Sequence, residues 1–251
     1  MAGRSTHVLG LRLALGPARD RHIRSADQPL EGAGSRRALT ARSSSGARRT
    51  GGIGAVAVDA AANPGPIRLG LVGAGTQAWT QLWAIRAVRQ VREATVAARR
   101  PERAEAFARR ATEELGVRVR AVHTAEEAVR DHDVVVAATN STSPVREADW
   151  IAPGTHLTTL GPKTVSRHEV PPALADRADV LLTDSLAQAA DYSEPHIFPA
   201  NRMVDLGAVL AGATTGRNSP RQITVFCSVG LAGTEVAVAA ALWKATRRNR
   251  S

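Results

Sequence analysis

The stretch that most constrains this chain is a short apolar run that ends in glycines and continues into a helical pattern. Residues 69–75 read LGLVGAG, and residues 76–90 place apolar side chains at helical spacing. Gly73, Gly75 and Ala78 form the pattern G-x-G-x-x-A after a predicted strand at 67–72. In this context the pattern predicts dinucleotide binding, with the amides near Thr76 and Gln77 facing the phosphates. The alternative is a turn that needs glycine only for its backbone dihedrals.

Strands and helices alternate beyond this turn. Predicted strands follow at 93–98, 117–122, 133–139, 155–161, 178–184 and 222–230, with helical stretches such as 101–115 between them. Apolar residues make up 43% of the chain, which is enough for a sizeable core. We therefore predict an α/β fold with a doubly wound, mainly parallel sheet, a Rossmann-like domain spanning residues 67–230.

The two ends of the chain differ from this domain. Residues 1–47 are rich in Arg, Gly and Ser without a sustained period, which predicts a disordered or irregular arm. Residues 51–63 are a helix candidate rich in small residues. Residues 231–251 are amphipathic and predict a C-terminal helix.

The end of the second predicted strand bears on the choice of cofactor. About 20 residues past the glycines, a carboxylate usually binds the ribose 2′-hydroxyl of NAD. This chain has Ala98, Arg99 and Arg100 there instead. Because an Arg can pair with a 2′-phosphate, NADP is favoured over NAD, with Arg99 as the contact. The alternative is that both are ordinary members of an Arg-rich chain.

Charge and composition limit the other partners. The net charge of +10 is compatible with nucleic-acid binding, but aromatic residues are only 3% of the chain, so the composition argues against it. No apolar stretch reaches the ~20 residues of a membrane span. The histidines lack metal-ligand spacing, so no metal site is expected. With a single cysteine, Cys227, and no uninterrupted apolar leader, we expect a cytoplasmic protein.

Taken in order, several motifs resemble the ornithine cyclodeaminase/mu-crystallin family over about residues 48–251. The motifs are RRTGGIGAVAVD (48–59), LGLVGAGTQAWTQLWAI (69–85), AARRPERAEAFA (97–108), DVVVAATNSTSPV (133–145), PGTHLTTLGPKTVSRHEVP (153–171) and ITVFCSVGLAGTEVAVAAALW (223–243). The resemblance implies a Rossmann domain that binds NAD or NADP and a second domain that binds substrate and forms a homodimer. Residues 48–66 would be a remnant helix of that second domain. The implied reaction is hydride transfer at the amine or imine carbon of an amino acid, as in cyclodeaminases, ketimine reductases and alanine dehydrogenases.

The resemblance also implies roles for individual residues. Arg49 would bind the substrate carboxylate, and Val229 would face the substrate. The implied cofactor-binding residues, besides Gly73 and Gly75, are Thr76, Gln77, Arg99, Thr139, Leu160, Gly161, Arg167 and Ser228.

Two departures from the family pattern bear on activity. Lys163 stands where the cyclodeaminases carry a catalytic Asp. It would act as a neutral base, or it is a solvated loop lysine. The chain has no lysine before Lys163, although the family's substrate domain carries one. An oxidoreductase or deaminase is therefore the first interpretation, and a catalytically inactive or truncated NAD(P)-binding protein is the alternative.

Overall fold

The fold is built on a single eight-stranded sheet in which every pairing is parallel, as a computed structural model of residues 34–230 and residue 234 shows. The strand order is β3-β2-β1-β4-β5-β8-β6-β7. The strands are β1 Ile67–Val72, β2 Val91–Ala97, β3 Val119–Ala121, β4 Val134–Ala137, β5 His156–Thr159, β6 Val180–Thr183, β7 Met203–Asp205 and β8 Thr224–Cys227. The order turns back at β1, from which β2 and β3 extend to one side and β4 to the other. This is the doubly wound arrangement predicted from the sequence.

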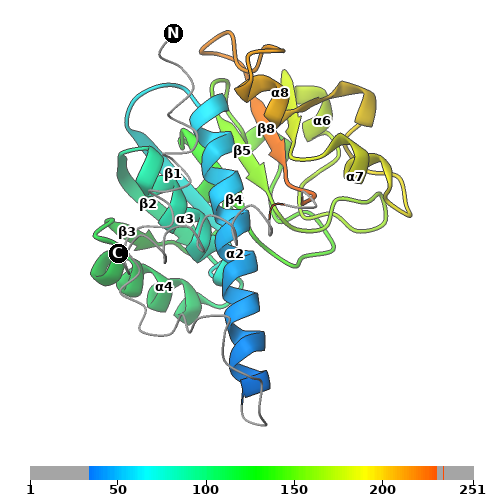
Figure 1. Ribbon diagram of the computed structural model, residues 1–251. Helices are drawn as coiled ribbons and strands as arrows, with labels where there is room; N and C mark the ends of the chain where they lie inside the picture. Colours follow the sequence, from blue (N-terminus) through cyan, green and yellow to red (C-terminus); the bar gives the residue numbers. More distant parts are fainter. Residues whose placement is uncertain (1–33, 231–233, 235–251) are drawn as a thin grey trace, which may run out of the picture.

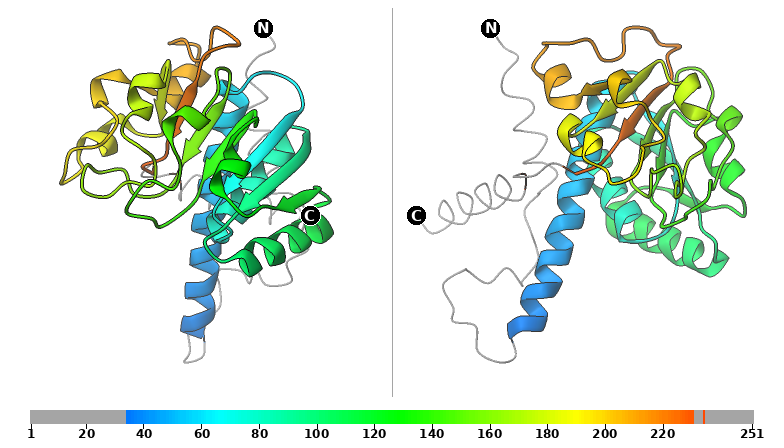
Figure 2. Two further views of the ribbon diagram at one scale, coloured as in Figure 1. Left: turned by 180° about the vertical axis from the view of Figure 1, so that it is seen from behind. Right: turned by 90° about the vertical axis from the view of Figure 1, so that its right-hand side faces the viewer.

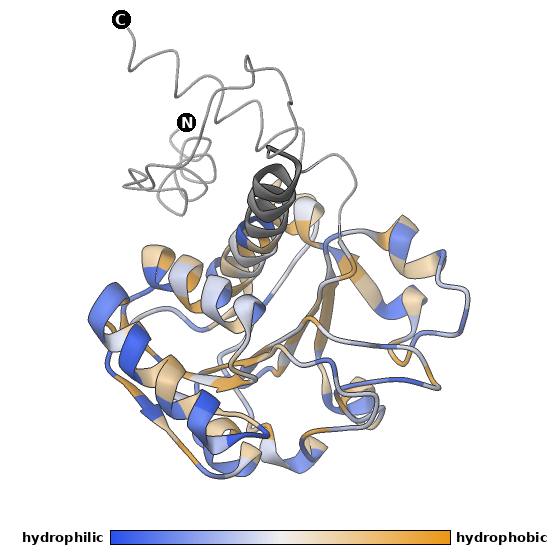
Figure 3. Cartoon of the chain, turned by 90° about the horizontal axis from the view of Figure 1, so that it is seen from below, coloured by the Kyte–Doolittle hydropathy of each residue, from blue (hydrophilic) through white to orange (hydrophobic). Residues whose placement is uncertain are grey.

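Helices cover both faces of the sheet (Figure 1). The α-helices are α2 Gly34–Ala61, α3 Thr76–Val88, α4 Pro101–Leu115, α5 Ala125–Val129, α6 Leu174–Arg177, α7 Leu186–Ala190 and α8 Leu206–Leu210, and the 3₁₀ helices are η1 Ala148–Trp150 and η2 Ala200–Arg202. Buried residues of α2, α3 and α4 pack against one face, and those of α5, α6 and α7 pack against the other. Seen along the layers, the apolar strands lie between helices whose hydrophilic sides face outward (Figure 3). The central strands β1, β4, β5, β6 and β8 are almost entirely buried because both of their faces are covered.

Helix α2 crosses one face of the sheet and links its two halves (Figure 1). Ala55 and Val58 join the core cluster of β1 and β4, whereas Ala57 and Ala61 pack with β6 and β8. Small residues bring α2 close to α3, since a Cβ at Gly51 would lie 2.4 Å from the carbonyl oxygen of Thr80. Such close packing fixes the orientation of α2 on the domain.

The start of α2 corrects one sequence prediction. The helix begins at Gly34 and extends beyond the body of the domain (Figure 2), so residues 34–47 are helical rather than irregular. The boundary expected at residue 48 falls inside this helix. Residues 34–47 contain no proline, and a packed helix that already exists at 48–61 can be lengthened without a new nucleation step. The rest of the expected arm, residues 1–33, lies outside the described residues.

Other predictions agree with the structure to within a few residues. The seven strands predicted from the sequence correspond to β1 to β6 and β8. Strand β7 was not predicted. The predicted C-terminal helix, 231–251, lies outside the described residues except for Thr234. Among the residues that the structure describes, no helix is long and apolar enough to cross a membrane.

Candidate functional site

All functional residues implied for the cofactor fall at one edge of the sheet. Because the strands are parallel, the segments that follow β1, β2, β4, β5, β6 and β8 emerge at their common carboxyl edge. In open α/β sheets, ligands bind outside this edge at the point where the strand order reverses. Here that point lies between β1 and β4, which are paired neighbours.

The glycine turn after β1 is tight at its first glycine and open at its second. Gly73 has φ of 108°, and a Cβ there would lie 2.4 Å from the carbonyl oxygen of Ala138. Its amide donates to the carbonyl of Ala97 (2.8 Å). Gly75, by contrast, is exposed, and a Cβ there would meet no atom within 4 Å. The turn therefore packs against β4 on one side and leaves free space in front of Gly75.

Helix α3 begins directly at this open space. Gly75 is its N-cap, no side chain caps the first turn by a hydrogen bond, and that turn contains no acidic residue. Thr76 is exposed and Gln77 is half-buried. The first amides of a helix carry partial positive charge, so this end of α3 suits an anion such as a diphosphate.

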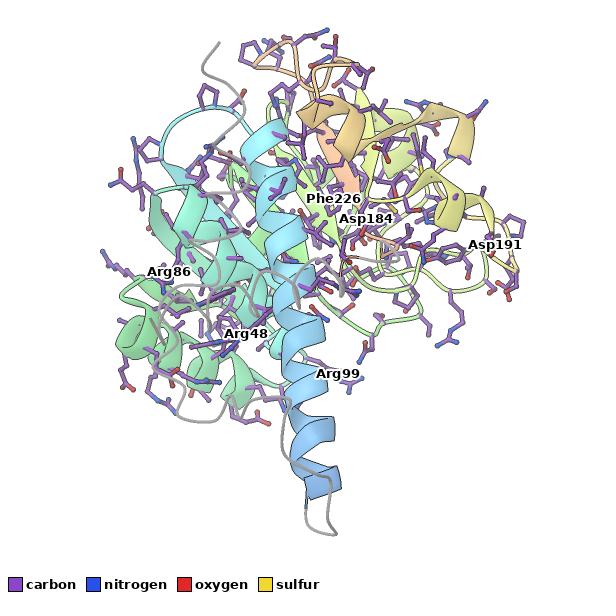
Figure 4. All side chains as sticks on the ribbon, in the orientation of Figure 1. Arg48, Arg86, Arg99, Asp184, Asp191 and Phe226 are labelled. Atoms are coloured by element: carbon purple, nitrogen blue, oxygen red, sulfur yellow. The ribbon has the colours of Figure 1, made fainter. Side chains whose placement is uncertain are left out.

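Arg99 follows β2 at the same edge and is exposed. Figure 4 shows its side chain extending away from the body of the domain. The next residue, Arg100, is the N-cap of α4. The position after the second strand is thus occupied by cations, with no carboxylate to repel a 2′-phosphate.

The loops after β4 and β5 are tied together by a residue for which the sequence suggested no role. Glu169 is fully buried. Its Oε2 accepts from the amide (2.9 Å) and hydroxyl (2.8 Å) of Thr139, and its Oε1 accepts from the hydroxyl of Thr159 (2.7 Å) and the amides of Leu160 (2.9 Å) and Gly161 (2.6 Å). The structure therefore brings together three residues implied for the cofactor, Thr139, Leu160 and Gly161.

A second buried carboxylate holds the end of β8. Asp184 accepts from the amides of Val229 (2.8 Å) and Gly230 (3.0 Å) and from the Ser228 hydroxyl (3.2 Å). Asp184 is buried directly after β6, which pairs with β8, and Figure 4 labels it together with Phe226 of β8. The cap of the following helix α7 is Ser185, which leaves the Asp184 carboxylate to position Ser228 and Val229.

Lys163 is not a solvated loop lysine, because only 2% of its surface is exposed. Its Nζ donates to the carbonyl oxygen of Gly161. Burial lowers the pKa of His196 to about 4, and the charge of Lys163 adds to this shift. Burial also raises the pKa of the Cys227 thiol to about 12, although Lys163 opposes that shift. Both shifts favour the uncharged forms of the His196 imidazole and the Cys227 thiol.

Two residues implied by the resemblance stand apart from these contacts. Arg167 is exposed on the loop between β5 and Glu169, where its amide bonds the carbonyl of Thr164 (3.1 Å). Arg49 lies on α2, which runs antiparallel to the strands, since the carbonyl of Ala61 accepts from Thr224 at the start of β8. Residues earlier in α2, including Arg49, therefore lie toward the carboxyl edge.

The signals that identify Glu169 and Asp184 are weak in the sequence. Glu169 directly precedes the buried Val170 and Asp184 directly follows the buried strand β6, so both are acids beside apolar residues. Such an acid is buried only when it is well paired. The pairing partners, however, come from distant parts of the chain. Among the described residues, no group of three or more His, Cys, Asp or Glu side chains is arranged to hold a metal ion.

Comparison with known proteins identifies the family. A model of the ornithine cyclodeaminase/mu-crystallin family matches residues 31–249. The chain belongs to this family. The match starts ahead of residue 48, so the family resemblance extends further toward the N-terminus than the motifs alone indicated.

Relatives within the family include oxidoreductases with different substrates. The chain is 33% identical over 203 residues to an alanine dehydrogenase of Archaeoglobus fulgidus, covering 78% of this chain and 62% of the relative. It is 31% identical over 204 residues to a Delta(1)-pyrroline-2-carboxylate reductase of Bacillus cereus, with the same coverage. The chain thus spans about 60% of the length of the curated relatives it matches.

A solved structure of Thermococcus litoralis Delta(1)-pyrroline-2-carboxylate reductase in complex with NADH and L-proline superposes with a TM-score of 0.75 at 28% identity. The alignment covers 82% of this chain and 66% of that one. The iminosuccinate reductase of Paracoccus denitrificans in complex with NAD+ gives a TM-score of 0.71 at 28% identity, covering 81% and 64%. These family members share the parallel sheet described above.

Proposed function

We propose that this chain binds NAD(P) at the carboxyl edge of its sheet and serves hydride transfer at the amine or imine carbon of an amino acid. One observation carries the proposal: the open space at Gly75 lies at the first amides of α3, beside the strand ends that Glu169 and Asp184 organise. Relatives of the chain include an alanine dehydrogenase and a pyrroline-carboxylate reductase, and both reactions change the same kind of carbon.

The residues present fit a dinucleotide. The backbone at Gly75, Thr76 and Gln77 would hold the diphosphate, because a Cβ-free residue allows close approach and the helix start supplies donors. Loops carrying Thr139, Leu160, Gly161, Arg167 and Ser228 would line the nicotinamide half. When bound, the nicotinamide ring supplies the hydride or accepts it.

We propose NADP as the preferred form. Arg99 is exposed after β2, where a guanidinium can bind a 2′-phosphate, and no carboxylate stands at this position to bind a free 2′-hydroxyl. Related structures contain NADH or NAD+, so both forms belong in any titration.

Substrate binding and proton transfer are assigned to three residues of this chain. Arg49 would bind the substrate carboxylate through its guanidinium, and Val229, held by Asp184, would contact the substrate. Lys163 would hold or move a proton at its Nζ, because it is buried at the carboxyl edge and bonded to the carbonyl of Gly161. A homodimer is part of the proposal, and a related archaeal alanine dehydrogenase is described as a dimer with bound NAD.

The test is a fluorescence titration of the chain with NADPH and NADH, followed by turnover assays with cyclic imines, ornithine and alanine. We expect saturable binding, tighter for NADPH, and turnover with at least one substrate. Binding without turnover would favour the alternative of a catalytically inactive NAD(P)-binding protein. If neither NADPH nor NADH binds, the proposal is contradicted.

A further inference from the structure

Glu169 stands out among the buried charged groups because it contacts two strand ends at once. Its two carboxylate oxygens receive five hydrogen bonds, two from Thr139 after β4 and three from residues 159–161 at the end of β5. A carboxylate that accepts this many bonds has no capacity left for water or ligand, and its role is exerted through the groups that it orients.

The packing around Glu169 allows little freedom. A Cβ at Gly161 would lie 2.5 Å from the carboxylate carbon of Glu169 and 2.4 Å from the carbonyl oxygen of Thr139. The carboxylate therefore needs glycine at position 161 to reach both loops.

A buried cation accompanies this carboxylate. Arg146 is 2% exposed, and within the described part of the chain its guanidinium nitrogens have no hydrogen-bond partner. Burial lowers the pKa of Arg146 to about 10, and the charge of Glu169 offsets part of that shift. The Glu169 carboxylate therefore interacts electrostatically with a buried cation as well as with its five hydrogen-bond donors.

We propose that Glu169 is a positioning residue that fixes the β4 and β5 loops in the geometry required by the nicotinamide half of the dinucleotide. The inference rests on the proposed function, because it assigns Thr139, Leu160 and Gly161 to that half. Glu169 itself does not touch the cofactor. The diphosphate and adenosine half depends on the turn at Gly75 and on Arg99, which Glu169 does not bond.

This division yields an experiment in which two probes separate positioning from general stability. ADP probes the adenosine and diphosphate half, and NAD(P)H, in whichever form the unmodified chain binds more tightly, probes the whole site. We expect Glu169→Gln to weaken NAD(P)H binding by about tenfold or more while ADP binding changes by less than about twofold. The amide of Gln would present donors to backbone amides that require an acceptor.

A matched pair of threonine variants covers the case in which Glu169→Gln does not fold. Thr159 and Thr224 are both fully buried and lie on the paired strands β5 and β8. Thr159 is at the carboxyl end of β5, whereas Thr224 is at the amino end of β8. Thr159 donates to Glu169, whereas Thr224 donates to the carbonyl of Ala61. Thr159→Val should weaken NAD(P)H binding by about threefold with ADP binding unchanged, and Thr224→Val should change neither.

Each outcome decides a separate point. If the unmodified chain binds neither ADP nor NAD(P)H, the proposed function fails and the inference fails with it. If the unmodified chain binds both probes, but Glu169→Gln and Thr159→Val bind NAD(P)H as tightly, only the inference about Glu169 is overturned. Equal weakening of ADP and NAD(P)H in Thr159→Val, or the same loss in Thr224→Val, also overturns it.

Discussion

The turn after β1 and the loops after β4, β5 and β8 share one edge of the sheet but are held in different ways. The turn is held by backbone packing at Gly73 and is empty of side chains at Gly75. The loops are held by Glu169 and Asp184, two buried carboxylates that bond amides and hydroxyls. The first region thus leaves open space beside an uncapped helix start that contains no acidic residue, whereas the second contains two carboxylates that are already hydrogen-bonded.

Placing a carboxylate in the empty turn should give the largest effect. Gly75→Asp has room for its side chain, because a Cβ there meets nothing within 4 Å, so the protein should fold normally. The added charge would occupy and repel the diphosphate position, and we expect NAD(P)H affinity to fall by about 100-fold or more. Gly75→Ala, measured in the same titration, is the control for loss of the glycine. Unchanged affinity in Gly75→Asp would show that the diphosphate binds elsewhere.

The two regions should also respond differently to a single methyl group. At Gly161 an added Cβ meets the Thr139 carbonyl and the Glu169 carboxylate at about 2.5 Å or less, whereas at Gly75 it meets open space. We expect Gly161→Ala to lower the free energy of unfolding by roughly 2–3 kcal/mol and Gly75→Ala to change it by less than about 1 kcal/mol. Urea unfolding of both variants measures the difference. Similar values for both would remove the distinction between a packed loop and an open turn.

Substitution of Arg99, which follows β2, should have a smaller effect that is selective for one form of the cofactor. Reversing its charge in Arg99→Asp should shift the ratio of NADPH to NADH affinity toward NADH by about tenfold, because a carboxylate repels the 2′-phosphate. Arg103→Asp, at a neighbouring exposed position on α4, is the matched charge reversal. If both variants shift the ratio equally, the preference reflects general positive charge rather than a contact with Arg99.

As the pH falls, the loop region should lose stability earlier than the glycine turn, because residues 73–77 contain no titratable side chain. His196 bonds the Phe198 amide (3.1 Å), and its pKa is lowered to about 4, chiefly by burial. An unfolded histidine titrates near 6.5, so below that pH the unfolded state binds a proton that the folded state does not. Stability is therefore fully present above pH 6.5 and is progressively lost as the pH falls from 6.5 toward 4.

The variant His196→Gln tests this assignment, because it removes the titrating group and should flatten the dependence between pH 6.5 and 4. Thermal unfolding at pH 7 and pH 5 gives the measurement. A pH dependence identical to that of the unmodified chain would assign the acid sensitivity to other groups, such as His156, whose pKa burial lowers to about 3.

The same contrast explains how far the sequence could be interpreted. The glycine turn was predicted correctly as a strand–turn–helix unit because its determinants are contiguous, from the apolar run of β1 to the helical spacing of α3. The roles of Glu169 and Asp184 were not predicted, because the partners of Glu169 lie up to 30 residues away and those of Asp184 about 45. The spacing of residues along the chain does not predict such long-range hydrogen bonds.

Two structural elements were missed for local reasons. Strand β7 has only three residues, Met203–Asp205, and no run of apolar residues marks it. The first part of α2 is rich in Ser, Gly and Arg, which resembles loop composition, yet it continues a helix that is packed from residue 47 onward. Pairing with β6 decides the conformation of β7, and the packed part of α2 supports the helix that precedes it; composition alone shows neither.

The position of Cys227 gives this site a built-in reporter. The chain has one cysteine, it ends β8 directly before the segment held by Asp184, and it is fully buried with a pKa raised to about 12. A thiol reagent can reach it only when that strand end separates from its neighbours, so the labelling rate measures how often the end of β8 opens. A bound dinucleotide that closes the edge of the sheet should slow that reaction, which would make occupancy measurable without any change in the sequence.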